Sequence, residues 1–321
     1  MTVSVLAGGL CSTVQDLGRV GYGAIGVGRA GALDPDALSL ANSLVGNPPG
    51  AAGLEITLAG PRLKFETDVA FALCGAPFDT RLDGRSLEAW RSHRALAGSV
   101  LEFSHARTGT RAWLAMAGGI DLPCVLGSRS TDLNARLGPL PRTLNAGDRL
   151  PVGAPSDRLP RDAPRWSLDP RPWFGTADAS PLRLLPGRDL SRLEQQSLEV
   201  LCRQPFRISA TSDRVALRLD GGPLRFRHSL ECVSEPLVEG VVQLPPDGRP
   251  IILLGEHPVS GGYPCIGIIA AADHARLAQA RPGAAVRFTL ISATEARRLL
   301  EERRRARSEL MAHVRRRLEH T

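Results

Sequence analysis

Short runs of apolar residues, each followed closely by glycine or proline, are the feature that most constrains the fold of this chain. Four clear runs are residues 69–74, 113–117, 215–219 and 251–254. This length suits β-strands, which average about 5–6 residues, whereas globular helices usually need about ten or more. The 33 glycines and 25 prolines provide turns between such strands. The pattern therefore predicts a mainly β protein with few helices.

Besides Asp273, which we expect to cap a short helix that ends at residues 282–283, helix starts are marked at three places. Asp34 is an N-cap residue type, and the proline that follows it is favoured at the first helical position. Ser191 with Glu194, and Ser292 with Glu295, have the spacing of a capping box, in which each residue satisfies a free backbone N–H of the other. We therefore expect short helices after the first two signals and a long C-terminal helix after the third.

The two halves of the chain share short strings in the same order. The glycine-proline strings at 59–65 and 221–226 are alike, and so are the strings at 97–103 and 282–288. Similar strings in a shared order are the signature of a duplicated structural unit. This order suggests two related β-barrel units, each with few helices.

Domain boundaries follow from composition. A chain of 321 residues with 43% apolar residues has enough core for two domains. Residues 156–181 are crowded with proline and lack apolar periodicity, which is typical of a linker. We therefore predict β-barrel domains over 1–155 and 182–292, and an arginine-rich C-terminal helix over 293–321.

Charge and cysteine content exclude several classes of function. The net charge of +7 would suit nucleic acid, but aromatic residues are only 4% of the chain, so a base-stacking surface is poorly supplied. The six cysteines form no C-x-x-C pair and lie near no histidine cluster, which favours reduced, mostly buried thiols over a metal site. No apolar run approaches the roughly 18 residues that span a membrane, and no leader is visible, so we expect a cytoplasmic protein.

Lys64 is the only lysine of the chain. A phosphate-binding loop of the G-x-x-x-x-G-K-[ST] type is therefore impossible, and no plausible lysine remains to carry biotin. Residues 21–26 and 26–31 do match a bare G-x-G-x-x-G pattern. They lack the strand before and the βαβ context that a dinucleotide site requires. We interpret them as a glycine-rich loop that passes close to another backbone or to a ligand.

Long ordered strings in both halves point to one family. They are residues 13–22, 31–34, 41–47, 54–58, 117–121, 125–131, 212–214, 243–251 and 261–264. Together these strings closely resemble the biotin-dependent carboxyltransferase and allophanate hydrolase subunit 2 family, up to about residue 290. The resemblance implies two tandem cyclophilin-like β-barrels with an active cleft between them.

The resemblance also implies an activity and its partners. It implies one component of an ATP-dependent hydrolase that opens 5-oxo-L-proline to L-glutamate, together with a homologous cyclophilin-like B subunit and a lactam-utilisation protein as the A subunit. ATP and Mg²⁺ would then act at the level of the complex, mainly on the partners, and the isolated chain would be inactive. Two alternatives stay open. One is a carboxyltransferase component acting on urea or another small amide, and the other is a regulatory binding protein that antagonises a kinase inhibitor.

Arg19 and Arg214 are the predicted catalytic cations. Amide cleavage or carboxylation places charge on a carbonyl oxygen, which an arginine can stabilise, and arginine can also hold a substrate carboxylate. A structural ion pair with a preceding aspartate is the alternative for both. Glu256, with His257 just after the strand-like run 251–254, is the predicted general base.

The predicted substrate-binding residues are the amides and glycines of the matching strings. Gln15 and Gln243 would hydrogen-bond an amide, although satisfying loop backbone is an equal alternative. Tyr263 would contact substrate through its hydroxyl, or be packed as an ordinary loop tyrosine. Residues 255–260 read Gly-Glu-His-Pro-Val-Ser where the family more often reads Ala-Asp-Arg-Gln-Thr-Thr, which leaves the exact substrate open. The remaining predicted substrate-binding residues are Asp34, Gly261 and Gly262.

Overall fold

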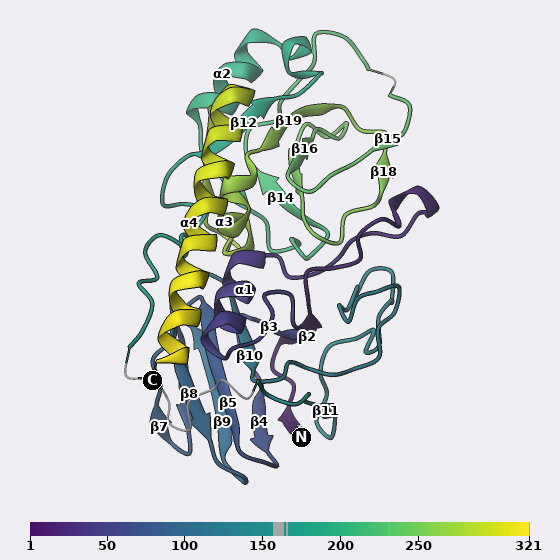
Figure 1. Ribbon diagram of the computed structural model, residues 1–321. Helices are drawn as coiled ribbons and strands as arrows, with labels where there is room; N and C mark the ends of the chain where they lie inside the picture. The colour runs from purple at the N-terminus through teal and green to yellow at the C-terminus, as the bar shows by residue number, and fades with distance from the viewer. Residues whose placement is uncertain (157–163, 165, 231, 321) are drawn as a thin grey trace. The chain divides into compact units, whose positions relative to one another are not determined.

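The computed structural model of the protein describes residues 1–156, 164, 166–230 and 232–320 (Figure 1). The chain forms two compact units. Unit 1 comprises Met1–Val20, Ala30–Phe174 and Ala306–Thr321, and unit 2 comprises Gly21–Arg29 and Gly175–Arg305. The predicted linker 156–181 falls partly on residues 157–163 and 165, which lie outside the described residues.

The described residues of unit 1 form eleven strands in two antiparallel sheets. The strands are β1 (Thr2–Ala7), β2 (Cys11–Gln15), β3 (Gly53–Thr57), β4 (Arg62–Phe65), β5 (Val69–Gly75), β6 (Phe78–Leu82), β7 (Arg85–Ser86), β8 (Ser92–Ala95), β9 (Val100–Ala106), β10 (Arg111–Met116) and β11 (Arg149–Pro151). One sheet has the order β11-β1-β4-β9-β6-β7, and the other has the order β2-β3-β10-β5-β8. Apolar side chains of both sheets form one core.

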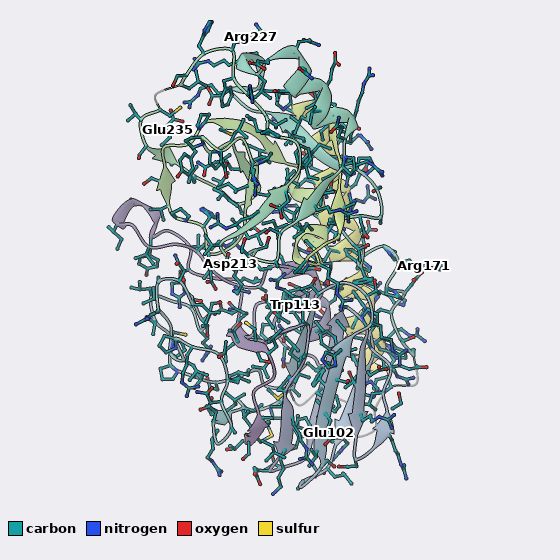
Figure 2. The ribbon with its side chains drawn as sticks, turned by 180° about the vertical axis from the view of Figure 1, so that it is seen from behind. Glu102, Trp113, Arg171, Asp213, Arg227 and Glu235 are labelled. Atoms are coloured by element: carbon teal, nitrogen blue, oxygen red, sulfur yellow. The ribbon has the colours of Figure 1, made fainter. Side chains whose placement is uncertain are left out.

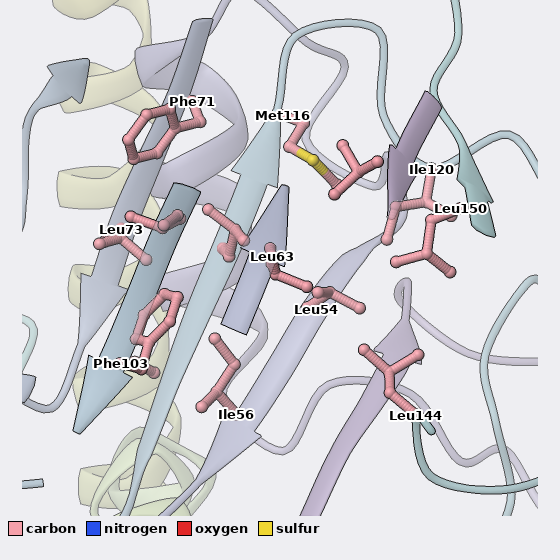
Figure 3. Close-up of a cluster of buried hydrophobic side chains, with 14 of the residues drawn as sticks. Leu54, Ile56, Leu63, Phe71, Leu73, Phe103, Met116, Ile120, Leu144 and Leu150 are labelled. Carbon is pink, nitrogen blue, oxygen red and sulfur yellow. The ribbon is translucent and has the colours of Figure 1, made fainter. Parts of the chain in front are cut away.

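The core of unit 1 follows from strand alternation. Leu54 and Ile56 of β3 are fully buried, as is Leu63 of β4 in the other sheet, and Figure 3 shows these side chains converging with Phe71 and Met116. Each fully buried side chain of this size contributes about 1.5–3 kcal/mol to folding. The short apolar runs of the sequence therefore become buried strands, as predicted.

Helix α1 (Pro35–Leu44) packs on the opposite face of the second sheet. Asp34 caps it: one carboxylate oxygen accepts hydrogen bonds from Asp36 N at 3.1 Å and Ala37 N at 3.0 Å. Leu38 is fully buried, and its Cδ1 lies 3.2 Å from where a Cβ on Gly53 of β3 would stand. The helix start predicted at Asp34 is confirmed.

Unit 2 is a single strongly curved sheet together with a small two-stranded sheet. Its strands are β12 (Leu182–Pro186), β13 (Phe206–Ile208), β14 (Ala216–Asp220), β15 (Glu235–Pro236), β16 (Val241–Gln243), β17 (Ile251–Leu253), β18 (Ser260–Gly261), β19 (Cys265–Ile269), β20 (Ala285–Val286) and β21 (Phe288–Leu290). The eight-stranded order is β20-β13-β14-β17-β16-β19-β12-β21, while β15 and β18 pair with each other. The end strands β20 and β21 are separated by a single residue, so the sheet curls until its two ends almost meet. Unit 2 is thus a nearly closed barrel, and the predicted mainly β fold of barrel domains is confirmed.

Apart from α1, the described residues form only a few helices. They are the 3₁₀ turns η1 (Gly23–Ile25), η2 (Leu190–Arg192) and η3 (Ala271–Asp273), the helices α2 (Gln195–Arg203) and α3 (His274–Ala278), and the C-terminal helix α4 (Ala293–Glu319). At the start of α4, Glu295 N donates to Ser292 Oγ at 3.1 Å, which confirms this predicted cap. Among the described residues, no helix is long and apolar enough to cross a membrane.

The capping box predicted at Ser191 is wrong. Ser191 lies inside η2, and α2 begins only at Gln195, with no side-chain hydrogen bond at its cap. The reason is a long-range contact: Glu194 N donates to Arg225 O at 2.9 Å, next to a β-bridge between Leu193 and Phe226. The backbone at Glu194 is therefore extended where a capping box needs it to be helical.

All six cysteines are free, as predicted, but they are not mostly buried. Only Cys74 is buried, and Cys124 is exposed. The glycine loop also matches its interpretation at one position. A Cβ on Gly31, which has φ +92°, would stand 2.9 Å from Gly18 N, so two backbone segments approach each other closely here.

Candidate functional site

In unit 1, the predicted amide Gln15 is the last residue of β2 and is fully buried. Its Nε2 donates to Thr131 O at 2.9 Å and to Thr13 Oγ1 at 3.0 Å. Because both N–H groups are used, the amide orientation is fixed. Its Oε1 is a buried acceptor for which the described part of the chain supplies no hydrogen-bond donor.

The predicted cation Arg19 lies four residues further along the chain and is only 2% exposed. Its Nη2 donates to the carbonyl oxygen of Ser130. Gly138 makes room for this contact, since a Cβ there would stand 2.5 Å from Ser130 O and 3.2 Å from Arg19 Nη2. The structure thus brings Gln15 and Arg19 together on two consecutive carbonyls, those of Thr131 and Ser130.

Asp16 lies between these two residues and was missed by sequence reasoning. Its carboxylate accepts hydrogen bonds from Gly18 N at 2.8 Å, from Ser128 Oγ and Ser130 Oγ at 2.6 Å each, and from Arg129 N at 2.6 Å. The sequence did contain a signal, because Asp16 lies in the string 13–22, which carries the family resemblance together with 125–131. In the structure, these two strings contact each other through this carboxylate. The two strings form one structural cluster.

Asp34, predicted to bind substrate, serves in the structure as the cap of α1 and is 2% exposed. Next to it, Leu33 N donates to Glu55 Oε2 at 3.0 Å, and Glu55 Oε1 lies 3.5 Å from Arg111 Nε in a buried ion pair. Burial raises the pKa of the nearby Cys74 thiol well above its usual range, and the negative charge of Asp34 raises it further. That thiol is therefore inert as a nucleophile.

The same sheet face carries Trp113 of β10, which is labelled in Figure 2. Trp113 stands opposite Glu55 in β3 and opposite Cys74 in β5. It is fully buried, and no hydrogen-bond partner for its indole Nε1 is found among the residues that the structure describes. Beneath α1, this face of unit 1 therefore buries several polar groups among apolar side chains, in contrast to the apolar core on the other side of the sheet.

In unit 2, the predicted catalytic residues Arg214 and Glu256 form a buried ion pair. Arg214 Nε donates to Glu256 Oε1 at 2.6 Å, and the side chains are 5% and 1% exposed. Arg214 comes just before β14 and Glu256 just after β17, and these antiparallel neighbours pair Ala216 with Leu253. Strand pairing therefore places the two side chains at the same end of the sheet.

The predicted substrate-binding residues of unit 2 form a second group. Gln243, at the end of β16, donates from Nε2 to Tyr263 O at 3.4 Å. A Cβ on Gly261 would stand 3.3 Å from that Nε2, and one on Gly262 would stand 3.2 Å from Cys232 O. The glycines thus permit close approach, while Tyr263 itself is 48% exposed.

The two groups of unit 2 lie at opposite ends of β17. Gln243 pairs with Ile251 at the start of this strand, whereas Glu256 follows its last residue, Leu253. Gln15 and Arg19 belong to unit 1. That all these residues share one cleft stays a prediction.

Arg188 was also missed by sequence reasoning. It forms ion pairs with Glu235 of β15, labelled in Figure 2, and with Asp189 Oδ2 at 3.3 Å. These two carboxylates, Glu235 first, raise the pKa of Arg188 above its usual range. Glu235 pairs with Gly261 in the two-stranded sheet of β15 and β18, and Asp189 Oδ2 also accepts from Cys265 N at 3.0 Å. A permanent cation is thus fixed beside the glycine pair.

Within the described ranges, no group of three or more His, Cys, Asp or Glu side chains is arranged to hold a metal ion. The polar chemistry of both units is instead carried by arginines, amides and backbone groups. Such donors suit the stabilisation of negative charge on a carbonyl or carboxylate oxygen.

Comparison with known proteins gives relatives along nearly the whole chain. The chain is 38% identical to the 5-oxoprolinase C subunit of Escherichia coli strain K12, over 94% of this chain and 96% of that protein. It is 34% identical to the 5-oxoprolinase C subunit of Haemophilus influenzae, over 90% and 91% of the two chains. It is also 30% identical to the urea amidolyase of Lachancea kluyveri, over 92% of this chain but only 17% of that much longer protein.

Solved structures also match nearly the whole chain. The crystal structure of TTHA0988 matches with a TM-score of 0.78 and 36% identity, over 90% of this chain and 55% of that one. The urea amidolyase of Kluyveromyces lactis matches with a TM-score of 0.86 and 27% identity, over 96% of this chain and 20% of that one. The chain thus spans about half of the first protein and a fifth of the second. Residues 25–290 match the family described as carboxyltransferase domain, subdomain A and B, and the chain belongs to this family.

Proposed function

We propose that this chain is the C subunit of a 5-oxoprolinase, which opens 5-oxo-L-proline to L-glutamate in a multi-subunit complex. The observation that carries the proposal is the end-to-end match to a protein named as the C subunit of 5-oxoprolinase, at 38% identity over 94% of this chain and 96% of the relative. A match of this extent spans both units, each of which carries one of the two predicted arginines.

The reaction breaks the C–N bond of the lactam. Oxygen from water joins the carbonyl carbon, a proton joins the nitrogen, and negative charge develops on the carbonyl oxygen on the way. The guanidinium groups of Arg19 and Arg214 are suited to stabilise that charge or to hold the substrate carboxylate. Gln15 offers a fixed, buried amide oxygen, which suits an N–H of the lactam.

ATP and Mg²⁺ belong to the proposal at the level of the complex. Lys64 is the only lysine, and the described residues hold no carboxylate cluster suited to a metal ion. Phosphoryl transfer requires cations around the phosphates, so these groups are assigned mainly to the two partners, a lactam-utilisation protein as the A subunit and a homologous cyclophilin-like B subunit. We assign no biotin attachment to this chain, and we place the complex in the cytoplasm.

The test is glutamate release from 5-oxo-L-proline in the presence of ATP and Mg²⁺. The purified chain alone should release none, and addition of both partner proteins should give turnover with matching ADP production. Turnover by the lone chain would show that the ATP site has been misplaced. A complete complex that hydrolyses no ATP in response to 5-oxo-L-proline would refute the assignment.

A carboxyltransferase component acting on urea or another small amide is the second candidate. It is favoured by the 30% identity to a urea amidolyase and by the TM-score of 0.86 with another. The two candidates differ in their requirement for a carboxyl donor. Transfer of labelled carboxylate from carboxybiotin to urea by the same complex, without glutamate release from 5-oxo-L-proline, would favour this second function.

A further inference from the structure

The carboxylate of Asp16 is the centre of the polar cluster in unit 1. Its Oδ1 accepts from Gly18 N, Ser128 Oγ and Ser130 Oγ, and its Oδ2 accepts from Arg129 N at 2.6 Å. Ser130 Oγ also accepts from Asp16 N at 2.9 Å. Short hydrogen bonds to an ionised carboxylate are about twice as strong as neutral ones. One side chain therefore ties the end of β2 to a segment more than a hundred residues away in the chain.

The segment held by Asp16 carries the two carbonyls that fix Gln15 and Arg19. Ser130 and Thr131 are both fully buried, and their carbonyl oxygens receive Arg19 Nη2 and Gln15 Nε2. Irregular backbone of this kind has no sheet ladder of its own to define its conformation. Side-chain hydrogen bonds therefore add to its few backbone hydrogen bonds, such as that from Thr131 N to Val14 O.

We propose that Asp16 is a positioning residue: it fixes the Ser128–Thr131 segment so that the carbonyls of Ser130 and Thr131 hold the Arg19 guanidinium and the Gln15 amide in their working orientation. The inference rests on the proposed function for its catalytic consequence, but not for the positioning itself. Asp16 acts only through Arg19 and Gln15. It exchanges no proton with substrate.

The isosteric change Asp16→Asn tests this directly. An asparagine Nδ2 group in place of Oδ2 would face Arg129 N–H donor to donor, so at least one hydrogen bond and the negative charge are lost. In the reconstituted complex we expect kcat/KM to fall roughly 10- to 100-fold, because a displacement of about 1 Å in a positioning group can cost about 100-fold. Asp148→Asn is the matched control, since Asp148 also accepts several hydrogen bonds, from Arg142 and Asn145 N, in the same unit but outside the cluster. It should change kcat/KM by less than about twofold.

A coupling measurement separates positioning from simple loss of stability. If Asp16 works through Arg19, then Asp16→Asn should cost much less in an Arg19→Met background than in the wild type. Additive effects of the two changes on kcat/KM would overturn the proposal. So would full activity of a folded Asp16→Asn complex. If Asp16→Asn does not fold, Ser130→Ala removes a single hydroxyl from the same carboxylate and takes its place in the cycle.

An activity-independent measurement keeps the inference distinct from the proposed function. Thr131 N donates to Val14 O at 2.9 Å and not to the Asp16 carboxylate, so its amide exchange reports the position of the segment. Asp16→Asn should raise the hydrogen–deuterium exchange rate at Thr131, and Asp148→Asn should not. Unchanged protection at Thr131 would overturn the positioning role. If the wild-type complex fails to open 5-oxo-L-proline, only the proposed function falls, and this exchange measurement still decides the role of Asp16.

Discussion

Arg214 Nε donates to Glu256 Oε1 at 2.6 Å in a pair whose side chains are 5% and 1% exposed. Glu256 N also donates to Arg214 O at 3.1 Å, so the two residues are joined through backbone and side chain. A buried pair of this kind is costly to break, because removal of one partner leaves the other charge uncompensated. Unit 2 therefore depends on both residues for folding, and their catalytic role stays a prediction.

We predict that Glu256→Gln lowers the free energy of unfolding by about 3–5 kcal/mol. The double change Arg214→Met with Glu256→Leu should recover much of that loss, because apolar residues of similar volume remove both charges at once. Urea denaturation of the purified chain measures both effects. The double variant should nevertheless stay inactive in the complex, which separates the folding role from the catalytic one.

An exposed pair in the same unit provides the control. Arg249 Nη1 lies 3.3 Å from Asp220 Oδ1, with side chains 60% and 50% exposed. Arg249→Ala should cost no more than about 1 kcal/mol. If Glu256→Gln lowered the free energy of unfolding as little as this control, unit 2 would not depend on the buried pair for its stability.

For Gln15, we predict that Gln15→Leu costs about 1–3 kcal/mol of stability, because the carbonyl of Thr131 loses a buried donor. In the proposed complex, kcat/KM should also fall, since the amide is lost. Gln196→Leu, on the exposed face of α2, is the control of the same chemistry and should leave both quantities nearly unchanged. Thermal melts and glutamate release measure the two effects, and a Gln15→Leu variant as stable and active as the control would contradict the prediction.

Helix α4 (yellow in Figure 1) is predicted to stabilise unit 1 through its last turns. Val314 is fully buried, Leu318 is 6% exposed, and Arg307 Nη1 lies 2.5 Å from Asp36 Oδ1 in the first turn of α1. Leu318→Ala should cost about 2–5 kcal/mol. Leu10→Ala, at a position 64% exposed in the same unit, should cost less than about 0.5 kcal/mol, and equal effects in denaturant unfolding would refute the packing role of the helix.

The contribution of Asp273 to the stability of the fold should depend on pH. Burial alone would raise the pKa of this carboxyl, but hydrogen bonds from Arg183, together with the charges of Arg276 and Arg183, lower it below its usual value. Because the folded pKa is depressed, the stabilisation is present above the unfolded pKa of about 3.9 and is lost as the pH falls through the folded pKa. The stability difference between wild type and Asp273→Asn should therefore shrink as the pH is lowered below about 4.

The measurement is a set of thermal melts of both proteins from about pH 7 down to the acid limit of folding. Arg183→Gln is a second variant for the same measurement. It removes the side chain that donates to Asp273 Oδ2 at 3.0 Å, so the folded pKa of Asp273 should rise towards its unfolded value and the loss of stability in acid should be smaller than in the wild type. A stability difference between wild type and Asp273→Asn that stays constant with pH would show that this carboxyl does not contribute in the predicted way.

The sequence by itself determined those features that a few consecutive residues encode. Asp34 followed by proline specifies the start of α1, and Ser292 specifies the start of α4, because a cap needs only the next three residues. Short apolar runs specify strands for the same reason. The strings that resemble a family pointed to Gln15 and Arg19, but not to what these side chains contact.

Tertiary structure alone decided the long-range partners. Gln15 bonds to Thr131, which is 116 residues away, and Asp16 bonds to Ser128, which is 112 residues away. The capping box predicted at Ser191 does not form, because Glu194 N donates its hydrogen bond to Arg225 O instead. No local sequence pattern reveals this partner. A hydrogen bond across such a distance depends on which strands pair and in which register, and that is set by burial of the whole core rather than by neighbours in the chain. The chain's local signals therefore fix its elements, while the packing of its sheets decides which polar side chains meet.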